Sequence, residues 1–120
     1  MRAAMFAILM SATPAWAEPV FHFYGALDCP PCMAFKRNHL ADVQATGVEY
    51  GFTVAENLVA RTAEVPQVGI YGAADPILRE ALEQGGLIAY PPVFFVSEDG
   101  KVRSVHGHDS RSALLSVSGD

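Results

Sequence analysis

The sequence contains only two cysteines among its 120 residues, and both lie in one tetrad, Cys29-Pro30-Pro31-Cys32. It has no surplus of positive charge, because eight Lys and Arg are outnumbered by thirteen Asp and Glu, for a formal net charge of −5. This balance argues against nucleic acid or an anionic membrane surface as a partner. No internal repeat, low-complexity tract or linker is present, so one domain is expected.

Long apolar runs are also missing. The N-terminal run covers residues 3–12, well short of the ~20 residues that a membrane-spanning helix needs. Arg2 precedes this run, and Ala15-Trp16-Ala17 follows it with the small-x-small pattern of a cleavage site. We therefore expect a signal peptide over residues 1–17, a domain over residues 18–120, and export to the oxidising periplasm. An uncleaved N-terminal anchor is the alternative.

The spacing of the two cysteines favours redox chemistry over a structural disulfide. A bridge across two residues closes a very small loop, so it constrains the unfolded chain little and stability is a weak reason for it. Two thiols at this spacing allow one thiolate to attack a substrate disulfide while the other resolves the mixed disulfide. Residues 20–24 have the pattern of a buried strand, and residues 33–44 have helical periodicity. A helix N-terminus at the tetrad favours a thiolate.

The remaining pattern predicts an α/β fold. Gly47 ends the first helix, residues 48–54 alternate as a strand, residues 56–64 form a short helix, and residues 66–72 form a turn or short strand.

The second half has clearer signals. A helix begins after Asp75 and stops at Gly85-Gly86, two strands over residues 93–96 and 101–105 form a hairpin, and a last short helix follows. This order predicts a sheet covered by helices on both faces.

These motifs resemble those of the thioredoxin family. The dithiol lies at a strand–helix junction, Pro92 opens the apolar strand, and Gly100 and Gly107 match the family's hairpin turn and strand-end glycine. The resemblance covers most of residues 20–117. It implies a thioredoxin-like fold, with a central mixed β-sheet flanked by helices on both faces. It also implies a protein thiol–disulfide oxidoreductase that uses no cofactor.

The resemblance also implies roles for individual residues. Cys29 is the more exposed nucleophile, and Cys32 is the buried resolving thiol. Pro92 is the cis-proline that packs against the pair, with an ordinary trans proline as the alternative.

The predicted substrate edge departs from the family at Pro91. The residue before the cis-proline normally offers both N–H and C=O to a bound client, and Pro91 has no N–H. Tyr90 and Leu27 flank this edge and are expected, with Pro91, to line an apolar groove for an unfolded client. Packing under the hairpin is an equal alternative for Tyr90.

Two further positions differ from the family pattern. Asp28 stands where a tryptophan is usual, and Phe23 stands where many thioredoxins have a buried acid that moves protons from the buried thiol. That role passes to water, Asp28 or His22, or is absent.

The tetrad also bears on the direction of electron flow. Pro30 and Pro31 have no N–H to donate to the Cys29 sulfur, and Asp28 adds a negative charge beside it, whereas the helix N-terminus acts in the opposite sense. The balance predicts a reductase or isomerase-like protein acting on protein clients. A reductase in an oxidising compartment needs electrons, which implies a membrane electron-transfer partner of the DsbD type. A disulfide-introducing oxidase is the alternative, and the short chain favours a monomer.

Two rival hypotheses come from other classes. His106 and His108 form an HxH pair which, with Cys29 and Cys32, has the ligand types of a periplasmic zinc or copper module. In the family layout the strand ending at Gly107 lies away from the dithiol, which favours two solvated loop histidines and no metal. The second rival is a redox-inert scaffold that keeps the fold.

Overall fold

The computed structural model describes residues 18–70, 75–86 and 90–118, so the expected signal peptide lies outside the described residues. The elements, in chain order, are β1 (Val20–Ala26), α2 (Pro30–Asn38), α3 (Leu40–Tyr50), β2 (Thr53–Val59), α4 (Glu64–Ile70), α5 (Pro76–Gln84), β3 (Val93–Glu98), β4 (Lys101–Gly107) and α6 (Ser110–Ser118). None of the helices within these ranges is long and apolar enough to cross a membrane.

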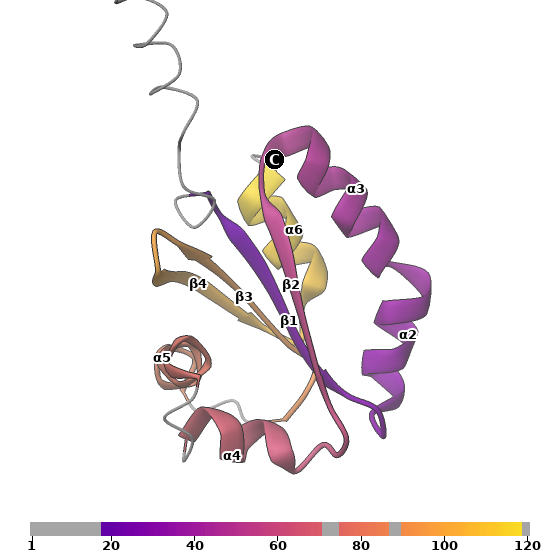
Figure 1. Ribbon diagram of the computed structural model, residues 1–120, viewed down its shortest axis with the longest axis vertical. Helices are drawn as coiled ribbons and strands as arrows, with labels where there is room; N and C mark the ends of the chain where they lie inside the picture. The colour runs from indigo at the N-terminus through magenta and orange to yellow at the C-terminus, as the bar shows by residue number, and fades with distance from the viewer. Residues whose placement is uncertain (1–17, 71–74, 87–89, 119–120) are drawn as a thin grey trace, which may run out of the picture.

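The four strands form one mixed sheet in the order β2-β1-β3-β4 (Figure 1). β1 lies parallel to β2 and antiparallel to β3, and β3 and β4 form an antiparallel hairpin. The hairpin turns at Asp99 and Gly100, which both adopt positive φ. The expected α/β fold, a central mixed sheet with helices on both faces, is confirmed.

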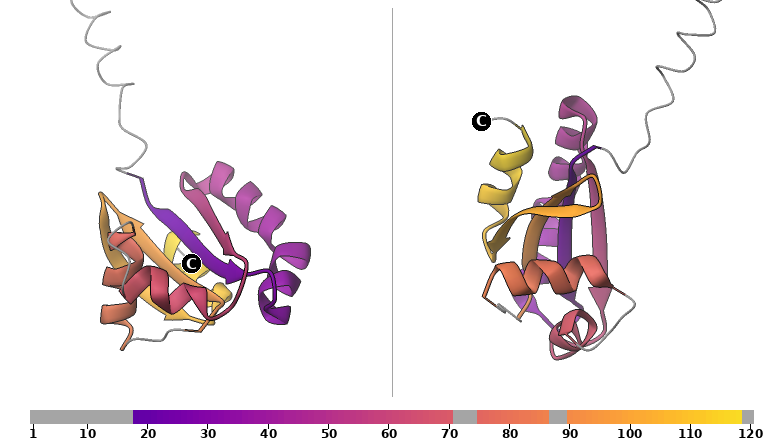
Figure 2. Two further views of the ribbon diagram at one scale, coloured as in Figure 1. Left: turned by 60° about the horizontal axis from the view of Figure 1, so that its bottom comes forward. Right: turned by 90° about the vertical axis from the view of Figure 1, so that its left-hand side faces the viewer.

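Alternation along β1 and β3 separates two cores. Phe21 and Phe23 of β1 and Phe94 of β3 pack against α2, α3 and α6 on one face. Tyr24 and Phe95 pack against α4 and α5 on the other face. The ribbon shows α4 and α5 on the opposite side of the sheet from α6 (Figures 1 and 2). Each fully buried Phe ring contributes about 1.5–3 kcal/mol relative to an exposed one, so the aromatic run of β1 anchors the strand that leads to the dithiol.

The first helix is longer than predicted and is divided in two. It breaks at His39 between α2 and α3 and continues to Tyr50, after which Gly51 adopts a left-handed φ of 83°. Gly47 does not end it. A Cβ at Gly47 would lie 2.6 Å from the carbonyl oxygen of Phe52, so this glycine allows a close approach of the chain rather than a turn.

The predicted strand over residues 48–54 and the predicted helix over 56–64 are therefore wrong. Val48 is 89 % exposed on α3, so the apolar alternation came partly from solvent-facing helix positions. β2 (Thr53–Val59) runs through the first part of the segment assigned to the helix, up to Val59. The turn or short strand expected over residues 66–72 is also wrong, because α4 runs through the described part of that segment with its proline in the first turn, where an N–H is not needed.

The second half follows the prediction. Asp75 caps α5 by accepting a hydrogen bond from the Leu78 N–H at 3.1 Å, and Gly85 closes the helix. The two hairpin strands begin at Val93 and Lys101, as expected.

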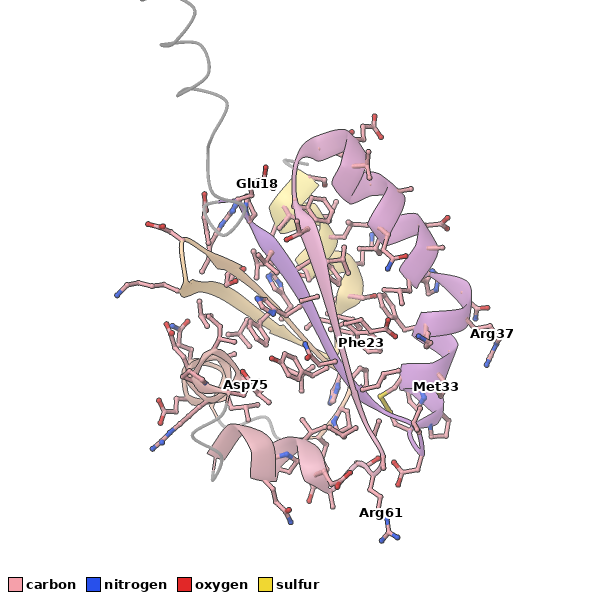
Figure 3. The ribbon with its side chains drawn as sticks, viewed as in Figure 1. Glu18, Phe23, Met33, Arg37, Arg61 and Asp75 are labelled. Carbon is pink, nitrogen blue, oxygen red and sulfur yellow. A yellow bond between two sulfur atoms is a disulfide. The ribbon has the colours of Figure 1, made fainter. Side chains whose placement is uncertain are left out.

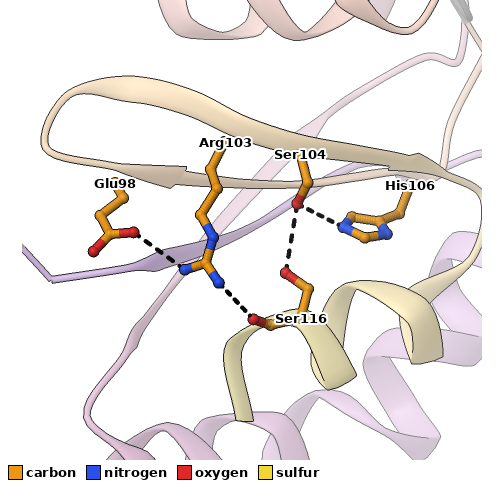
Figure 4. A network of polar contacts seen from close by, with 5 residues as sticks. All are labelled: Glu98, Arg103, Ser104, His106 and Ser116. Atoms are coloured by element: carbon orange, nitrogen blue, oxygen red, sulfur yellow. Dashed lines mark hydrogen bonds and ion pairs between the residues drawn. The ribbon is translucent and has the colours of Figure 1, made fainter. Parts of the chain in front are cut away.

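A polar network ties α6 to β4 (Figure 4). Arg103 donates to Glu98 at 3.2 Å and to the main-chain oxygen of Ser116 at 2.9 Å, which places a cation at the C-terminal end of α6. Ser104 Oγ lies 2.8 Å from His106 Nε2 and 3.4 Å from Ser116 Oγ. These contacts fix the C-terminal end of α6 against the middle of β4.

Candidate active site

The two cysteines form a disulfide at the start of α2. Cys29 is the N-cap of the helix, Cys32 lies in its first turn, and their Cα atoms are 5.2 Å apart. Figure 3 shows the yellow S–S bond beside Met33, where β1 leads into α2. Cys29 is 5 % exposed and Cys32 is 0 % exposed, so an incoming disulfide meets Cys29 first.

The two prolines of the tetrad limit the donors around the Cys29 sulfur. Pro30 and Pro31 occupy the first two helical positions, where an N–H has no partner within the helix, so they suit the helix. The Cys32 N–H donates to Cys29 Sγ at 3.2 Å. The next N–H, that of Met33, is taken by the Cys29 carbonyl oxygen at 3.0 Å. The helix N-terminus therefore directs a single first-turn N–H at the sulfur.

The prolines before β3 face the same sulfur. The Pro91 carbonyl oxygen lies 3.7 Å from Cys29 Sγ, both Pro91 and Pro92 are buried, and the peptide bond between them is cis. The disulfide sulfur has no hydrogen to donate, so this oxygen can accept from Cys29 only when the thiol is reduced and protonated. A hydrogen bond to the neutral thiol disfavours the thiolate, so this contact acts against the helix N-terminus.

Asp28 is bonded to a neighbouring loop. Its Oδ1 accepts from the N–H and from the hydroxyl of Thr62, each at 2.7 Å. The bond from the Thr62 hydroxyl is the largest influence that lowers the pKa of Asp28. Asp28 therefore joins the turn before the dithiol to the segment between β2 and α4.

Phe23, which occupies the position of the family's buried acid, lies near the buried thiol, whereas His22, a possible replacement for that acid, does not. Phe23 lies beside Cys32, since a Cβ built at Gly25 would come within 3.0 Å of both the Phe23 ring and Cys32 Cβ. His22 lies on the opposite face of the sheet, with its Nε2 2.7 Å from Ser97 Oγ and its ring stacked on Phe95. His22 therefore does not serve the buried thiol. Burial lowers its pKa to about 4, a shift that the negative charge of Asp75 partly offsets.

The structure brings most of the predicted edge residues together. Pro31, Tyr90, Pro91 and Pro92 line one groove beside the dithiol. Tyr90 is 66 % exposed, so simple packing under the hairpin does not describe it. Leu27 is 61 % exposed but is not among the residues that line this groove.

His108 is the groove residue that sequence reasoning missed. The strand ending at Gly107 was expected to lie away from the dithiol, yet His108 lines the groove with Pro31, and its Nδ1 lies 2.8 Å from the Pro92 carbonyl oxygen. The expectation fails because Gly107 pairs with Phe94, which places the end of β4 beside the start of β3. The sequence did contain a signal for this position. Pro92 and Gly107 are fifteen residues apart and lie at the two ends of the predicted hairpin, so pairing of its strands brings them together.

The two histidines of the HxH pair do not converge. His106 contacts Ser104 Oγ through Nε2 and Ser112 Oγ through Nδ1 at 2.7 Å, whereas His108 contacts Pro92. Across the described ranges, no three His, Cys, Asp or Glu side chains are grouped so as to hold a metal ion.

Two solved structures are similar to the chain. A thioredoxin from Fasciola hepatica matches with 18 % identity and a TM-score of 0.49, over 98 % of this chain and 92 % of that one. A thiol:disulfide interchange protein of the thioredoxin family, from Chlorobium tepidum TLS, matches with 18 % identity and a TM-score of 0.45, over 88 % and 80 %. No protein-family model and no curated protein matches.

The strand order and the cysteine pair carry the structural conclusion by themselves. A mixed sheet with the Cys29–Cys32 pair after its parallel-paired central strand, and Pro92 before the antiparallel one, is a thioredoxin-like arrangement. Such a pair at a helix N-terminus is suited to thiol–disulfide exchange.

Proposed function

We propose that the chain is an exported, periplasmic thiol–disulfide oxidoreductase that exchanges disulfides with protein clients through Cys29 and Cys32. The observation that carries the proposal is the position of the pair. The Cys29 sulfur accepts an N–H at the start of α2, beside a groove of prolines and Tyr90, while Cys32 lies buried behind it. A purely structural bridge does not need such a groove.

The exchange proceeds in two steps that conserve electrons. The Cys29 thiolate attacks one sulfur of a client disulfide, forms a mixed disulfide and releases the other client sulfur as a thiolate. Cys32 then loses its proton and attacks Cys29 Sγ, which releases the second client thiolate. The client disulfide is thereby reduced by two electrons, and the Cys29–Cys32 disulfide forms.

We further propose that the protein works as a reductase or isomerase rather than as a strong oxidant. Strong oxidants of this type stabilise their reduced, thiolate-bearing form. Here Pro30 and Pro31 donate nothing to the sulfur, and the Pro91 carbonyl oxygen favours the neutral thiol. A periplasmic reductase needs electrons from a membrane partner of the DsbD type, and a monomer of one domain, residues 18–120, suits this shuttle role.

The trapping of mixed disulfides tests the proposed function. Cys32→Ser should accumulate a mixed disulfide with scrambled, disulfide-containing ribonuclease or with insulin, because Cys29 still attacks the client disulfide and the resolving thiol is gone. Cys29→Ser is the matched control and should trap nothing, because Cys32 is buried. Wild-type protein should reduce insulin with dithiothreitol as electron source. Equal trapping by both variants, or no effect of either on insulin reduction, contradicts the proposal.

A further inference from the structure

The groove beside the dithiol offers few main-chain hydrogen-bond donors. Three of its lining residues, Pro31, Pro91 and Pro92, have no N–H. The N–H of Cys32 is directed at the Cys29 sulfur. An extended polypeptide that crosses this edge must pair its own N–H and C=O groups, because a buried polar group left unpaired costs about 1–3 kcal/mol. The main-chain acceptors of the groove are also engaged, because the Pro91 carbonyl oxygen lies 3.7 Å from Cys29 Sγ and the Pro92 carbonyl oxygen accepts from His108. An N–H of the client therefore needs a side-chain acceptor.

His108 is exposed, and its ring is held in one tautomer. A carbonyl oxygen only accepts, so the 2.8 Å contact with Pro92 requires that His108 Nδ1 carries the hydrogen and donates it. In the neutral ring Nε2 then has a lone pair and no hydrogen. No residue of the described part of the chain pairs with this Nε2. The contact with Pro92 thus orients an acceptor at the groove.

The position of His108 also suits a bound chain. The groove beside the dithiol continues into a second groove between α2 and the start of α6, and the two share Pro31, Pro92 and His108. Asn38 and Ser110 line the second groove. A polypeptide that runs from the dithiol toward α6 must pass the imidazole.

We propose that His108 is a specificity-determining residue that accepts a hydrogen bond from a main-chain N–H of the client, close to the client's reacting cysteine. The inference rests on the proposed function, since it concerns how the same site recognises a polypeptide. His108 takes no part in the covalent steps, which belong to the two sulfurs. It makes the site select polypeptide disulfides over small ones.

Two substrates separate recognition from chemistry. The first is a short peptide closed by one disulfide, and the second is bis(2-hydroxyethyl) disulfide, which has no main chain. His108→Phe keeps an aromatic ring and removes the acceptor. It should lower kcat/KM for the peptide about five- to tenfold, mainly through KM, and change the small disulfide less than about twofold. A tenfold loss corresponds to about 1.4 kcal/mol, the size of one net hydrogen bond. Tyr50→Phe, which removes a polar group from an exposed ring at the end of α3 and outside both grooves, should leave both values within about twofold.

A series of N-methylated peptides identifies the bond itself. The wild-type protein should discriminate about five- to tenfold against one peptide whose N–H next to the cysteine is replaced by N–CH₃, and His108→Phe should not. Equal losses on peptide and small disulfide, or unchanged discrimination in His108→Phe, overturn the inference while leaving the proposed function intact. A wild-type protein that reduces neither substrate instead refutes the proposed function, and the inference with it.

Discussion

Acid should weaken the fold through His22, which is buried on the face of the sheet away from the dithiol. Its Nδ1 has no hydrogen-bond partner among the described residues, and its Nε2 contacts Ser97 Oγ. Burial lowers the pKa of His22 from 6.5 to about 4, with Asp75 as the nearby opposing charge. The unfolded chain therefore binds this proton more readily than the folded chain between these two pH values.

The sign and size of the effect follow from this difference. The stabilisation is fully present above pH 6.5 and is lost as the pH falls toward about 4, because protonation then favours the unfolded chain. At about 1.4 kcal/mol for each pH unit, the loss amounts to about 3 kcal/mol. Other titrating groups also contribute to the pH dependence of stability, among them the carboxylates and Tyr24, whose hydroxyl donates to Asp75. A variant that changes only His22 and its partner keeps these groups, so their contributions cancel when its pH dependence is compared with that of the wild-type protein.

The assay is urea unfolding of the oxidised protein between pH 4 and pH 7. His22→Phe/Ser97→Ala replaces both hydrogen-bonding partners with apolar groups and should remove about 3 kcal/mol of pH dependence relative to the wild-type protein. Ser97→Ala alone keeps the imidazole and should keep the dependence. If the double variant and the wild-type protein lose stability in parallel over this range, the buried neutral histidine is not the cause and the reasoning is refuted.

Two further predictions concern the dithiol. Pro31→His adds an N–H in the first turn of α2 and a group that can become positive, and both stabilise the Cys29 thiolate. We expect the reduction potential, measured against glutathione, to rise by ~30 mV or more, which is equivalent to about 1.4 kcal/mol. An unchanged potential would contradict the role given to the double proline. Gly25→Ala places a Cβ 2.9 Å from the Phe23 ring and 3.0 Å from Cys32 Cβ. We expect a loss of about 1–3 kcal/mol in the free energy of unfolding, measured by urea denaturation, and an unchanged value would contradict the close packing at this position.

The features that the sequence predicted correctly are those encoded locally. The proline tetrad at a strand–helix junction, the Asp75 cap and the turn at Gly100 each depend on residues a few positions apart. The segment after α2 was mispredicted because the helix ends at Gly51, which adopts the left-handed conformation, and Gly47 instead makes room for the Phe52 carbonyl oxygen.

The missed parts of the site depend on contacts between distant segments. Asp28 and Thr62 are separated by 34 positions, and nothing in either local sequence marks their hydrogen bonds. His108 reaches Pro92 only because the β3–β4 register pairs Gly107 with Phe94. The residues around His108 in the sequence are those of a solvated loop. Only the pairing of β3 with β4 places His108 at the groove.

The reduction potential of the Cys29–Cys32 pair tests the central claim most directly. Equilibration with glutathione or dithiothreitol, followed by alkylation of the free thiols, gives the potential of the pair in the full protein. We expect reversible reduction between about −270 and −180 mV, the range of reductases and isomerases with this chemistry. A value near −120 mV would identify a strong oxidant and contradict the direction proposed here, and a value below about −300 mV would identify a structural disulfide and contradict the redox function itself.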